Sequence, residues 1–291
     1  MNILVTGSDG QLGSEIKIIA NNCSADNFIF KNSYELNICD FKKTKDFILN
    51  NNINAIINCA AYTDVDKAEN DSSTAMNVNS NGVINLIKSL TANNGRLIHI
   101  STDYVFDGNT NIAYKESDPV NPIGVYGKTK RSGELEVLNS HLDAIVIRTS
   151  WLYSSYGNNF LNKLLRISKN SQSLNIISDQ FGTPTYAKNL AKTCVDIISN
   201  YHYDRMDSNG KLYHYSNEGS ASWFDFAIAI KEMANLDIKI NQIDTKNYAS
   251  EVERPMFSVL DKSKIKKVFD IKISYWKDSL KDCIDKIKNS L

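Results

Sequence analysis

Tyr126 and Lys130 stand four residues apart, and their side chains could carry acid–base chemistry. The segment 126–138 is predicted to be a helix, on which residues i and i+4 share one face. We therefore expect the Lys130 ammonium beside the phenol, where a positive charge lowers the pKa of a tyrosine from its usual ~10. Such a phenol can donate a proton to a developing alkoxide or accept one from an alcohol. Alternatively, the spacing is that of two ordinary surface residues on a helix.

A glycine-rich turn near the N-terminus gives this pair a chemical context. The apolar run 2–6 is typical of a buried strand, and an amphipathic helix follows the turn. Three glycines at three-residue spacing lie between them, in the stretch Gly7-Ser8-Asp9-Gly10-Gln11-Leu12-Gly13. Strand, glycine turn and helix in this order predict a dinucleotide site, because glycine lets the backbone approach the pyrophosphate and the helix N-terminus offers free N–H groups. A plain turn, which needs only one glycine, is the alternative.

Strand and helix signals alternate along most of the chain. Runs rich in strand-forming residues occur at 2–6, 27–30, 55–59, 96–101, 144–148 and 174–178, with helical periodicity between them, for example at 41–51 and 72–93. This alternation predicts an α/β fold with a doubly wound parallel sheet, whose ligands bind beyond the carboxyl ends of the strands. After residue 177 the alternation loosens. The polar stretch 200–211 is predicted to be a surface loop before a strand at 212–216.

Bulk composition excludes several classes of protein. The chain has 291 residues, a formal net charge of +0 and a pI near 6.9, so no overall field favours nucleic acid or an anionic membrane. No apolar run reaches the ~20 residues of a membrane helix. The five cysteines are widely spaced, which favours reduced thiols: Cys23, Cys39, Cys59, Cys194 and Cys283. We expect a cytoplasmic protein with no nucleic-acid or membrane partner.

The glycine spacing and the tyrosine–lysine pair together resemble the extended short-chain dehydrogenase/reductase superfamily. Further blocks resemble the dTDP-4-dehydrorhamnose reductase family, in order along nearly the whole chain: 58–69, 101–108, 148–151, 179–185, 216–219 and 254–260. The resemblance implies a Rossmann domain, mainly residues 1–178, and a smaller, discontinuous substrate lobe, mainly residues 179–291. Some late segments are expected to return to the main sheet.

The resemblance also implies a reaction. The protein would reduce the 4-keto group of dTDP-4-dehydro-6-deoxy-L-mannose to give dTDP-L-rhamnose, with Tyr126 as proton donor. Lys130 would bias the phenol and touch the nicotinamide ribose, and Thr102 would hold the ketone oxygen. Ser101 is an alternative to Thr102, although the family pattern aligns Thr102, and either hydroxyl could simply cap the end of a strand. Asp103 and Trp151 would contact the sugar; alternatively, Trp151 is a core residue.

Cofactor contacts follow from the same resemblance. They are expected at Gly7, Gly10, Gln11, Leu12, Gly13, Lys31, Asp40, Phe41, Ala60, Ala61, Tyr62, Thr63, Tyr126 and Lys130. In the stretch 30–34, Lys31 occurs without a carboxylate, which favours the 2′-phosphate of NADPH over NADH. Use of both cofactors remains open. Asp40 and Phe41 would flank the adenine.

The sequence also bears on other possible functions, on the oligomeric state and on a structural metal. A sugar-nucleotide dehydratase is disfavoured because Tyr104, and not a second carboxylate, follows Asp103. The chain could reduce another 4-keto sugar nucleotide, or could be a regulatory subunit of the same fold. A homodimer is possible. We expect no structural metal, because Lys188 and Lys192 lie where ligands to a cation near Glu15 would be needed.

Overall fold

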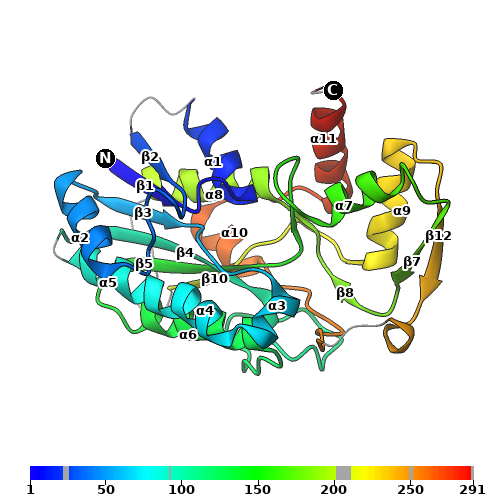
Figure 1. Ribbon diagram of the computed structural model, residues 1–291, viewed down its shortest axis with the longest axis horizontal. Helices are drawn as coiled ribbons and strands as arrows, with labels where there is room; N and C mark the ends of the chain where they lie inside the picture. The colour runs from blue at the N-terminus through cyan, green and yellow to red at the C-terminus, as the bar shows by residue number, and fades with distance from the viewer. Residues whose placement is uncertain (22–25, 92, 201–210, 249–251, 290–291) are drawn as a thin grey trace.

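A parallel six-stranded sheet forms the centre of the protein (Figure 1). The computed structural model describes residues 1–21, 26–91, 93–200, 211–248 and 252–289. The sheet has the order β10-β5-β4-β3-β1-β2, and every neighbouring pair is parallel. Its strands are β1 (Asn2–Thr6), β2 (Asn27–Lys31), β3 (Ala55–Asn58), β4 (Arg96–Thr102), β5 (Asp143–Thr149) and β10 (Leu212–His214). The predicted parallel α/β architecture is confirmed.

Helices cover both faces of this sheet, because side chains along each strand alternate between the faces. Ile3 and Val5 pack toward one helix layer, and Leu4 packs toward the other. The first layer consists of α1 (Gln11–Ala20), α8 (Ala187–Asn200) and α10 (Ser263–Phe269). The second consists of α2 (Phe41–Asn50), α5 (Gly82–Thr91) and α6 (Val125–Leu138). The predicted helix at 126–138 is thus α6, and the doubly wound arrangement is confirmed.

The predicted strand at 174–178 forms but does not join the main sheet. This strand, β7 (Ser173–Ile177), pairs in parallel with β12 (Lys239–Ile243), and β10 takes the outer position beside β5. A strand pattern specifies which residues face a core but not which strand lies beside it, so the sequence could not assign the partner. Residues 201–210 of the predicted loop lie outside the described residues, as does Cys23.

A smaller lobe with its own apolar core lies beside the sheet (Figure 1). It contains β7, β12, α7 (Phe160–Ile167), α9 (Trp223–Ala234) and α11 (Trp276–Lys288). Short strands lie in or next to it: β6 (Leu152–Tyr153), β8 (Phe181–Gly182), β9 (Thr185–Tyr186) and β11 (Ala221–Ser222). The chain passes between the sheet and the lobe more than once. The lobe elements α7 and β7 come before residue 179, the predicted boundary. After that residue, β10 joins the sheet, and α8 and α10 pack on it.

The helix predicted at 72–93 is broken in the middle. It consists of α4 (Ser72–Met76), a π-helical turn η1 (Asn77–Asn81) and α5, and it is preceded by α3 (Val65–Asn70). Asparagine is a weak helix former, and a π-turn inserts an extra residue that often serves a site. Here the turn directs the Asn79 side chain inward, where it is 1% exposed. The described residues also form two 3-10 turns, η2 (Asp103–Val105) and η4 (Thr245–Asn247).

The contact between α6 and η1 leads to a first prediction. A Cβ atom added at Gly133 would overlap the backbone oxygen of Asn79. We expect Gly133→Ala to lower the free energy of unfolding by ~1–3 kcal/mol, because the strain of overpacking exceeds the gain in helix propensity. Urea unfolding measures the change. Glu136→Ala, at an exposed position of the same helix, is the control and should change stability little. A more stable Gly133→Ala variant would contradict the close contact.

Candidate active site

The glycine turn lies at the carboxyl end of β1 and is shaped by close backbone contacts. Gly7 has φ +63°, a left-handed conformation that favours glycine, and a Cβ atom there would lie 2.7 Å from the Ala60 nitrogen. A Cβ atom at Gly13 would lie 2.6 Å from the Gly7 oxygen. Gly10 is the N-cap residue of α1. The three glycines therefore let β1, α1 and the chain after β3 meet closely, as a pyrophosphate site requires.

The first turn of α1 carries two further predicted cofactor residues. Gln11 begins the helix, where N–H groups have no partner within the helix. Its buried Oε1 atom has no hydrogen-bond partner, and Gly157 approaches from the loop before α7, where a Cβ atom would lie 3.1 Å from the Gln11 Cγ. Leu12, by contrast, is 4% exposed and packs in the core. At Leu12, therefore, the backbone and not the side chain is available for an anion.

Residues 60–63 follow β3 and run beside the glycine turn, as predicted. Ala60, Ala61 and Tyr62 are half-buried, and Thr63 is exposed. Asn79 holds this segment from both sides: its Oδ1 atom accepts from the Tyr62 nitrogen at 2.9 Å, and its Nδ2 atom donates to the Tyr62 oxygen at 3.1 Å.

Asn79 links this segment to α6, since Nδ2 also donates to Thr129 Oγ1 at 3.0 Å. Asn79 was not among the predicted site residues. The available signal was the run of alternating asparagines 77, 79 and 81 inside an otherwise helical segment, because such residues favour local side-chain hydrogen bonds over a regular helix.

Lys31 lies at the end of β2, next to the glycine turn, where the Ser8 nitrogen donates to the Lys31 oxygen at 3.2 Å. The expectation that no carboxylate lies near it is wrong. Glu35 pairs with Lys31 at 3.2 Å, and Asn32 donates to Asp9 at 2.7 Å. Glu35 lies one residue beyond the stretch 30–34 that the prediction considered, and a turn brings it back to the lysine. A 2′-phosphate at Lys31 would therefore compete with the Glu35 carboxylate.

Asp40 and Phe41 lie at the start of α2. The Asp40 carboxylate accepts a hydrogen bond from the Lys43 nitrogen at 3.1 Å and so caps the helix. This contact is the largest cause that holds the Asp40 pKa below its usual value. Phe41 is 42% exposed. Asp40 thus has a structural role, and the predicted adenine contact of both residues remains a prediction.

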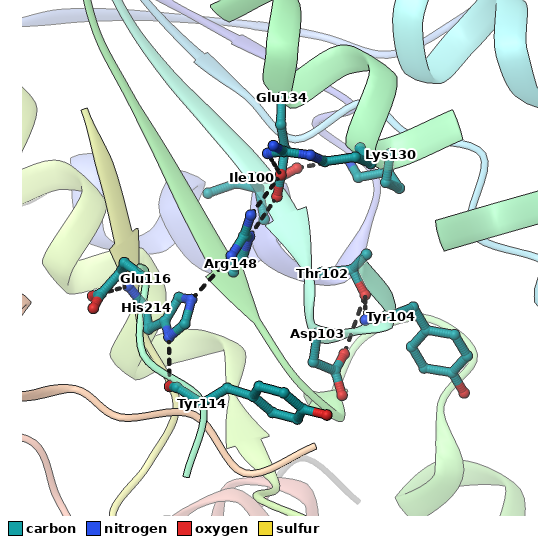
Figure 2. Close-up of polar contacts among 11 residues, drawn as sticks. Ile100, Thr102, Asp103, Tyr104, Tyr114, Glu116, Lys130, Glu134, Arg148 and His214 are labelled. Carbon is teal, nitrogen blue, oxygen red and sulfur yellow. Dashed lines mark hydrogen bonds and ion pairs between the residues drawn. The ribbon is translucent and has the colours of Figure 1, made fainter. Parts of the chain in front are cut away.

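The catalytic candidates lie at the carboxyl end of β4 and in the first two turns of α6. Thr102 ends β4 and is buried; its hydroxyl donates to Asp103 at 3.1 Å and accepts from the Tyr104 nitrogen at 3.2 Å (Figure 2). Tyr126 is half-buried, and its ring meets the Tyr104 ring edge-on with centroids 5.6 Å apart. The Thr102 hydroxyl lies close enough to lower the pKa of the Tyr126 phenol. Ser101 instead lies near Glu134, so the geometry favours Thr102 of the two hydroxyls.

The prediction of a lowered tyrosine pKa is wrong for the protein without ligand. Burial raises the pKa of Tyr126 to about 12, and the Thr102 hydroxyl opposes this shift only in part, while Asp103 adds to it. The Lys130 ammonium donates to the Ile100 oxygen at 2.6 Å (Figure 2). Burial also lowers the pKa of Lys130 to about 8, against the opposing charge of Glu134. Desolvation of a buried site therefore outweighs the attraction between neighbours that the i, i+4 spacing suggested.

The two predicted sugar contacts differ in their surroundings. Asp103 is 2% exposed, and burial raises its pKa to about 6 although Ser258 and Thr102 oppose the shift. Trp151 follows β5 with φ +46°, a left-handed conformation that is strained for a bulky side chain. Its indole stacks on Trp223 with centroids 3.6 Å apart and planes 7° apart. Trp151 is half-buried, so it is not an ordinary core residue.

A cavity of about 250 Å³ opens next to this pair of indoles, in the smaller lobe. Its lining is mainly apolar and aromatic, with cationic and amide groups: Phe160, Lys163, Leu174, Gln180, Trp223, Tyr248 and Arg254 belong to it. Arg254 also reaches the sheet domain, where its guanidinium pairs with Asp66 at 2.6 Å. Arg254 thus connects the cavity with the chain after β3. Neither Arg254 nor Trp223 was among the predicted site residues.

The predicted metal-free environment of Glu15 has a specific structure. The carboxylate is buried, pairs with Lys286 at 2.9 Å and accepts from Ser154 at 2.6 Å. Lys286 of α11, and neither lysine named in the prediction, provides the neutralising charge. Within the described residues, no group of three or more His, Cys, Asp or Glu side chains could hold a metal ion. The absence of a structural metal remains a prediction.

Known proteins can now be compared with this geometry. The family model described as RmlD substrate binding domain matches residues 1–289. A dTDP-4-dehydrorhamnose reductase of Aggregatibacter actinomycetemcomitans is 38% identical, with 96% of this chain and 97% of that protein covered. The chain belongs to the dTDP-4-dehydrorhamnose reductase family. It is therefore an oxidoreductase, and the family resemblance found in the sequence is confirmed.

Two further relatives show the range of this family. The spore coat polysaccharide biosynthesis protein SpsK of Bacillus subtilis is 34% identical over 96% of this chain and 95% of its own length. The solved structure of a dTDP-4-dehydrorhamnose reductase from Bacillus anthracis, in complex with NADP, has a TM-score of 0.92 and 30% identity, with 98% of this chain and 99% of that chain covered. Among the described helices of this family member, none is long and apolar enough to cross a membrane.

The buried Lys130 leads to a prediction about stability. Its pKa is about 8 in the folded protein against 10.5 when unperturbed, so the native state binds fewer protons between these pH values and stability rises with pH across this window. Lys130→Met removes this cost. The free energy of unfolding of the variant minus that of the parent protein should therefore depend on pH. This difference should be larger at pH 7 than at pH 10 by up to ~3 kcal/mol.

Urea unfolding without cofactor at the two pH values provides the measurement. Lys128→Met is the matched control, since Lys128 is exposed on the same helix and its replacement should show little pH dependence. A pH-independent difference between Lys130→Met and the parent protein would contradict the depressed lysine pKa.

Proposed function

We propose that the protein reduces the 4-keto group of dTDP-4-dehydro-6-deoxy-L-mannose and forms dTDP-L-rhamnose, with NADPH as the reductant. The observation that carries this proposal is the meeting of Thr102, Tyr126 and Lys130 at the strand edge that also holds the glycine turn. A proton donor beside a dinucleotide site is what reduction of a carbonyl requires.

The residues present fit a nicotinamide dinucleotide. Gly7 and Gly13 let the backbone around the turn pack so closely that a Cβ atom would not fit, and Gln11 keeps a buried oxygen without a partner at the helix start. The Bacillus anthracis relative was solved with NADP, and we carry that cofactor over to this protein. Gly7, Gly10 and the first turn of α1 would hold the pyrophosphate. When bound, the reduced cofactor supplies a hydride to the carbonyl carbon.

Tyr126 then donates a proton to the ketone oxygen, and Thr102 and Lys130 assist it. The raised pKa keeps Tyr126 protonated at neutral pH, which is the form that donates to an oxygen gaining negative charge. Thr102 can donate a second hydrogen bond to the same oxygen, if its hydroxyl turns from Asp103. Lys130, on the next turn of α6, adds a positive charge and a hydrogen-bond donor on the same helix face. Reduction leaves an alcohol on the sugar and a phenolate on Tyr126, which regains its proton from water.

The cavity beside Trp223 supports a sugar nucleotide as the substrate. Phe160, Trp223 and Tyr248 offer aromatic surface for a base, and Lys163 and Arg254 offer positive charge for a diphosphate. Trp151, held by Trp223, would present an apolar ring to the deoxysugar, and Asp103 would bind its hydroxyls. We further propose that residues 1–178 mainly bind the cofactor and residues 179–291 mainly bind the substrate.

A different 4-keto sugar nucleotide is the second candidate substrate. The observation that favours it is the 34% identity to SpsK, a relative named for spore coat polysaccharide biosynthesis. A regulatory subunit without catalysis is less well supported, because Tyr126, Lys130 and Thr102 are all present and placed together, and a binding module does not need a proton donor.

Turnover tests these candidates directly. Purified protein should oxidise NADPH when dTDP-4-dehydro-6-deoxy-L-mannose is supplied, and kcat/KM should be higher for this substrate than for other dTDP- or UDP-linked 4-keto sugars. A higher kcat/KM for another 4-keto sugar would assign that substrate instead. Binding of NADPH without turnover of any of them would favour the regulatory role.

Removal of the phenol tests the proton donor. Tyr126→Phe keeps the ring against Tyr104 but removes the hydroxyl, so cofactor binding should persist while kcat falls at least ~10²-fold, the usual effect of losing an acid–base group. Stopped-flow or steady-state oxidation of NADPH gives kcat, and fluorescence titration gives the cofactor affinity. Tyr104→Phe, which removes the neighbouring phenol, is the control and should retain far more activity. Normal turnover by Tyr126→Phe would refute the assignment.

Lys31 and its partner Glu35 test the choice of cofactor. We expect NADPH to bind more tightly than NADH, so that Kd for NADH divided by Kd for NADPH exceeds one. Lys31→Ala should reduce this ratio by about fivefold, because a charge-assisted contact with the 2′-phosphate is lost. Glu35→Gln should increase that ratio, since the lysine no longer shares its charge with a carboxylate. Isothermal titration calorimetry measures both affinities. An unchanged ratio in both variants would place the 2′-phosphate site elsewhere.

A further inference from the structure

A buried carboxylate, that of Glu134, lies on the same helix as Tyr126 and Lys130. Tyr126, Lys130 and Glu134 stand at positions i, i+4 and i+8 of α6, so they share one face of the helix and point toward the sheet. Lys130 is 2% exposed and Glu134 is 0% exposed. A charged carboxylate is thus buried one helical turn beyond the catalytic lysine.

Arg148 of β5 holds this carboxylate in a fixed position (Figure 2). Its Nε atom donates to one Glu134 oxygen at 2.8 Å, and a terminal nitrogen donates to the other at 2.9 Å. Arg131 adds a contact of 2.8 Å from the rim. Arg148 is itself 1% exposed, lies over the Phe106 ring at 5.0 Å and approaches His214 Nε2 at 3.4 Å.

Such a pair needs an explanation beyond stability. Removing two charges from water costs about as much as their attraction returns, and apolar residues of similar size often stabilise a core equally well or better. Burial works to raise the Glu134 pKa, but Arg148, Ser101 and Arg131 hold it below the usual value. The arrangement therefore keeps a negative charge inside the protein at neutral pH.

The other titratable groups that face Lys130 are neutral in this range. Cys59, at the end of β3, has a pKa raised by burial to about 12, and His99 of β4 has a pKa well below its usual value because of burial and the Lys130 charge. Burial depresses the Lys130 pKa, and Glu134 is the main charge that opposes the shift. Glu134 is consequently the group on which the protonation of Lys130 depends.

We propose that Glu134, fixed by Arg148, is a positioning residue for the reduction: it keeps Lys130 in the ammonium form behind Tyr126. This inference rests on the proposed reductase function, but its central claim concerns the ionisation of Lys130 and can be tested without turnover. The Glu134–Arg148 pair acts through Lys130, and it touches neither substrate nor cofactor in this assignment.

The first measurement is an NMR titration of Lys130 in the full-length protein without ligand, using ¹³C-labelled lysine and the Lys130→Met variant to assign the signal. Glu134→Gln should lower the titration midpoint of Lys130 by about one pH unit, the size expected when a close opposite charge is removed. Glu136→Gln removes an exposed carboxylate two residues away and should leave the midpoint in place.

A second variant separates this effect from misfolding. Glu134→Gln leaves Arg148 buried without its partner, so the double variant Glu134→Gln with Arg148→Met replaces both charges and restores a neutral core. It should fold, and its Lys130 midpoint should lie below that of Arg148→Met, which differs from it only in the Glu134 charge. Equal midpoints in these two folded variants would overturn the proposal, whatever substrate the protein uses.

The pH dependence of kcat/KM tests whether the reduction needs the positive charge of Lys130. At basic pH, the double variant should lose activity at a lower pH than Arg148→Met, by the same interval as their NMR midpoints. Near pH 8.5 it should therefore be about tenfold less active than Arg148→Met. A shifted midpoint with an unshifted profile would refute the role in reduction. If the parent protein turned over none of the sugar nucleotides, the proposed function would fail, while the NMR result would still decide the claim about Lys130.

Discussion

The parallel hydrogen-bond ladder of the central sheet brings the carboxyl ends of β1, β3, β4 and β5 to one edge, and the candidate site depends on this alignment. The glycine turn leaves β1 there, and Thr102 ends β4 two strands away. Helix α6 then packs beside β4 and β5, which places Tyr126 next to Thr102. A change of register in any of these strands would separate the glycine turn from Thr102 and Tyr126.

Desolvation sets the chemistry of that edge. Lys130 is buried and Tyr126 is half-buried, and their loss of water favours the neutral phenol strongly and the ammonium only weakly. An ion pair, Glu134 with Arg148, lies on the next turn of the same helix, and Arg148 approaches His214 of the neighbouring edge strand β10 (Figure 2). With little water around it, a buried charge acts more strongly on its neighbours than the same charge would at the surface.

The smaller lobe completes the site with segments that are remote in sequence. Trp151 adopts a left-handed backbone conformation, and Trp223 stacks on its ring. Gly182 makes room for the same indole, since a Cβ atom there would lie 2.5 Å from the ring. Strain of this kind persists only where surrounding contacts fix it, and it is typical of ligand-binding positions. The lobe thus presents an aromatic surface at the edge where the sheet presents its polar groups.

Local patterns in the sequence were enough to predict the parallel sheet, the glycine turn after β1 and the helix that carries Tyr126 and Lys130, because each depends on residues a few positions apart. The tertiary structure decided what no local pattern contains. The partner of β7 is β12, and Asn79 faces inward from a π-turn. The direction of the Tyr126 pKa shift also belongs to this group. The spacing of Lys130 predicted a decrease, but burial by elements distant in the chain produced an increase, because desolvation depends on everything packed around a group and not on its sequence neighbours.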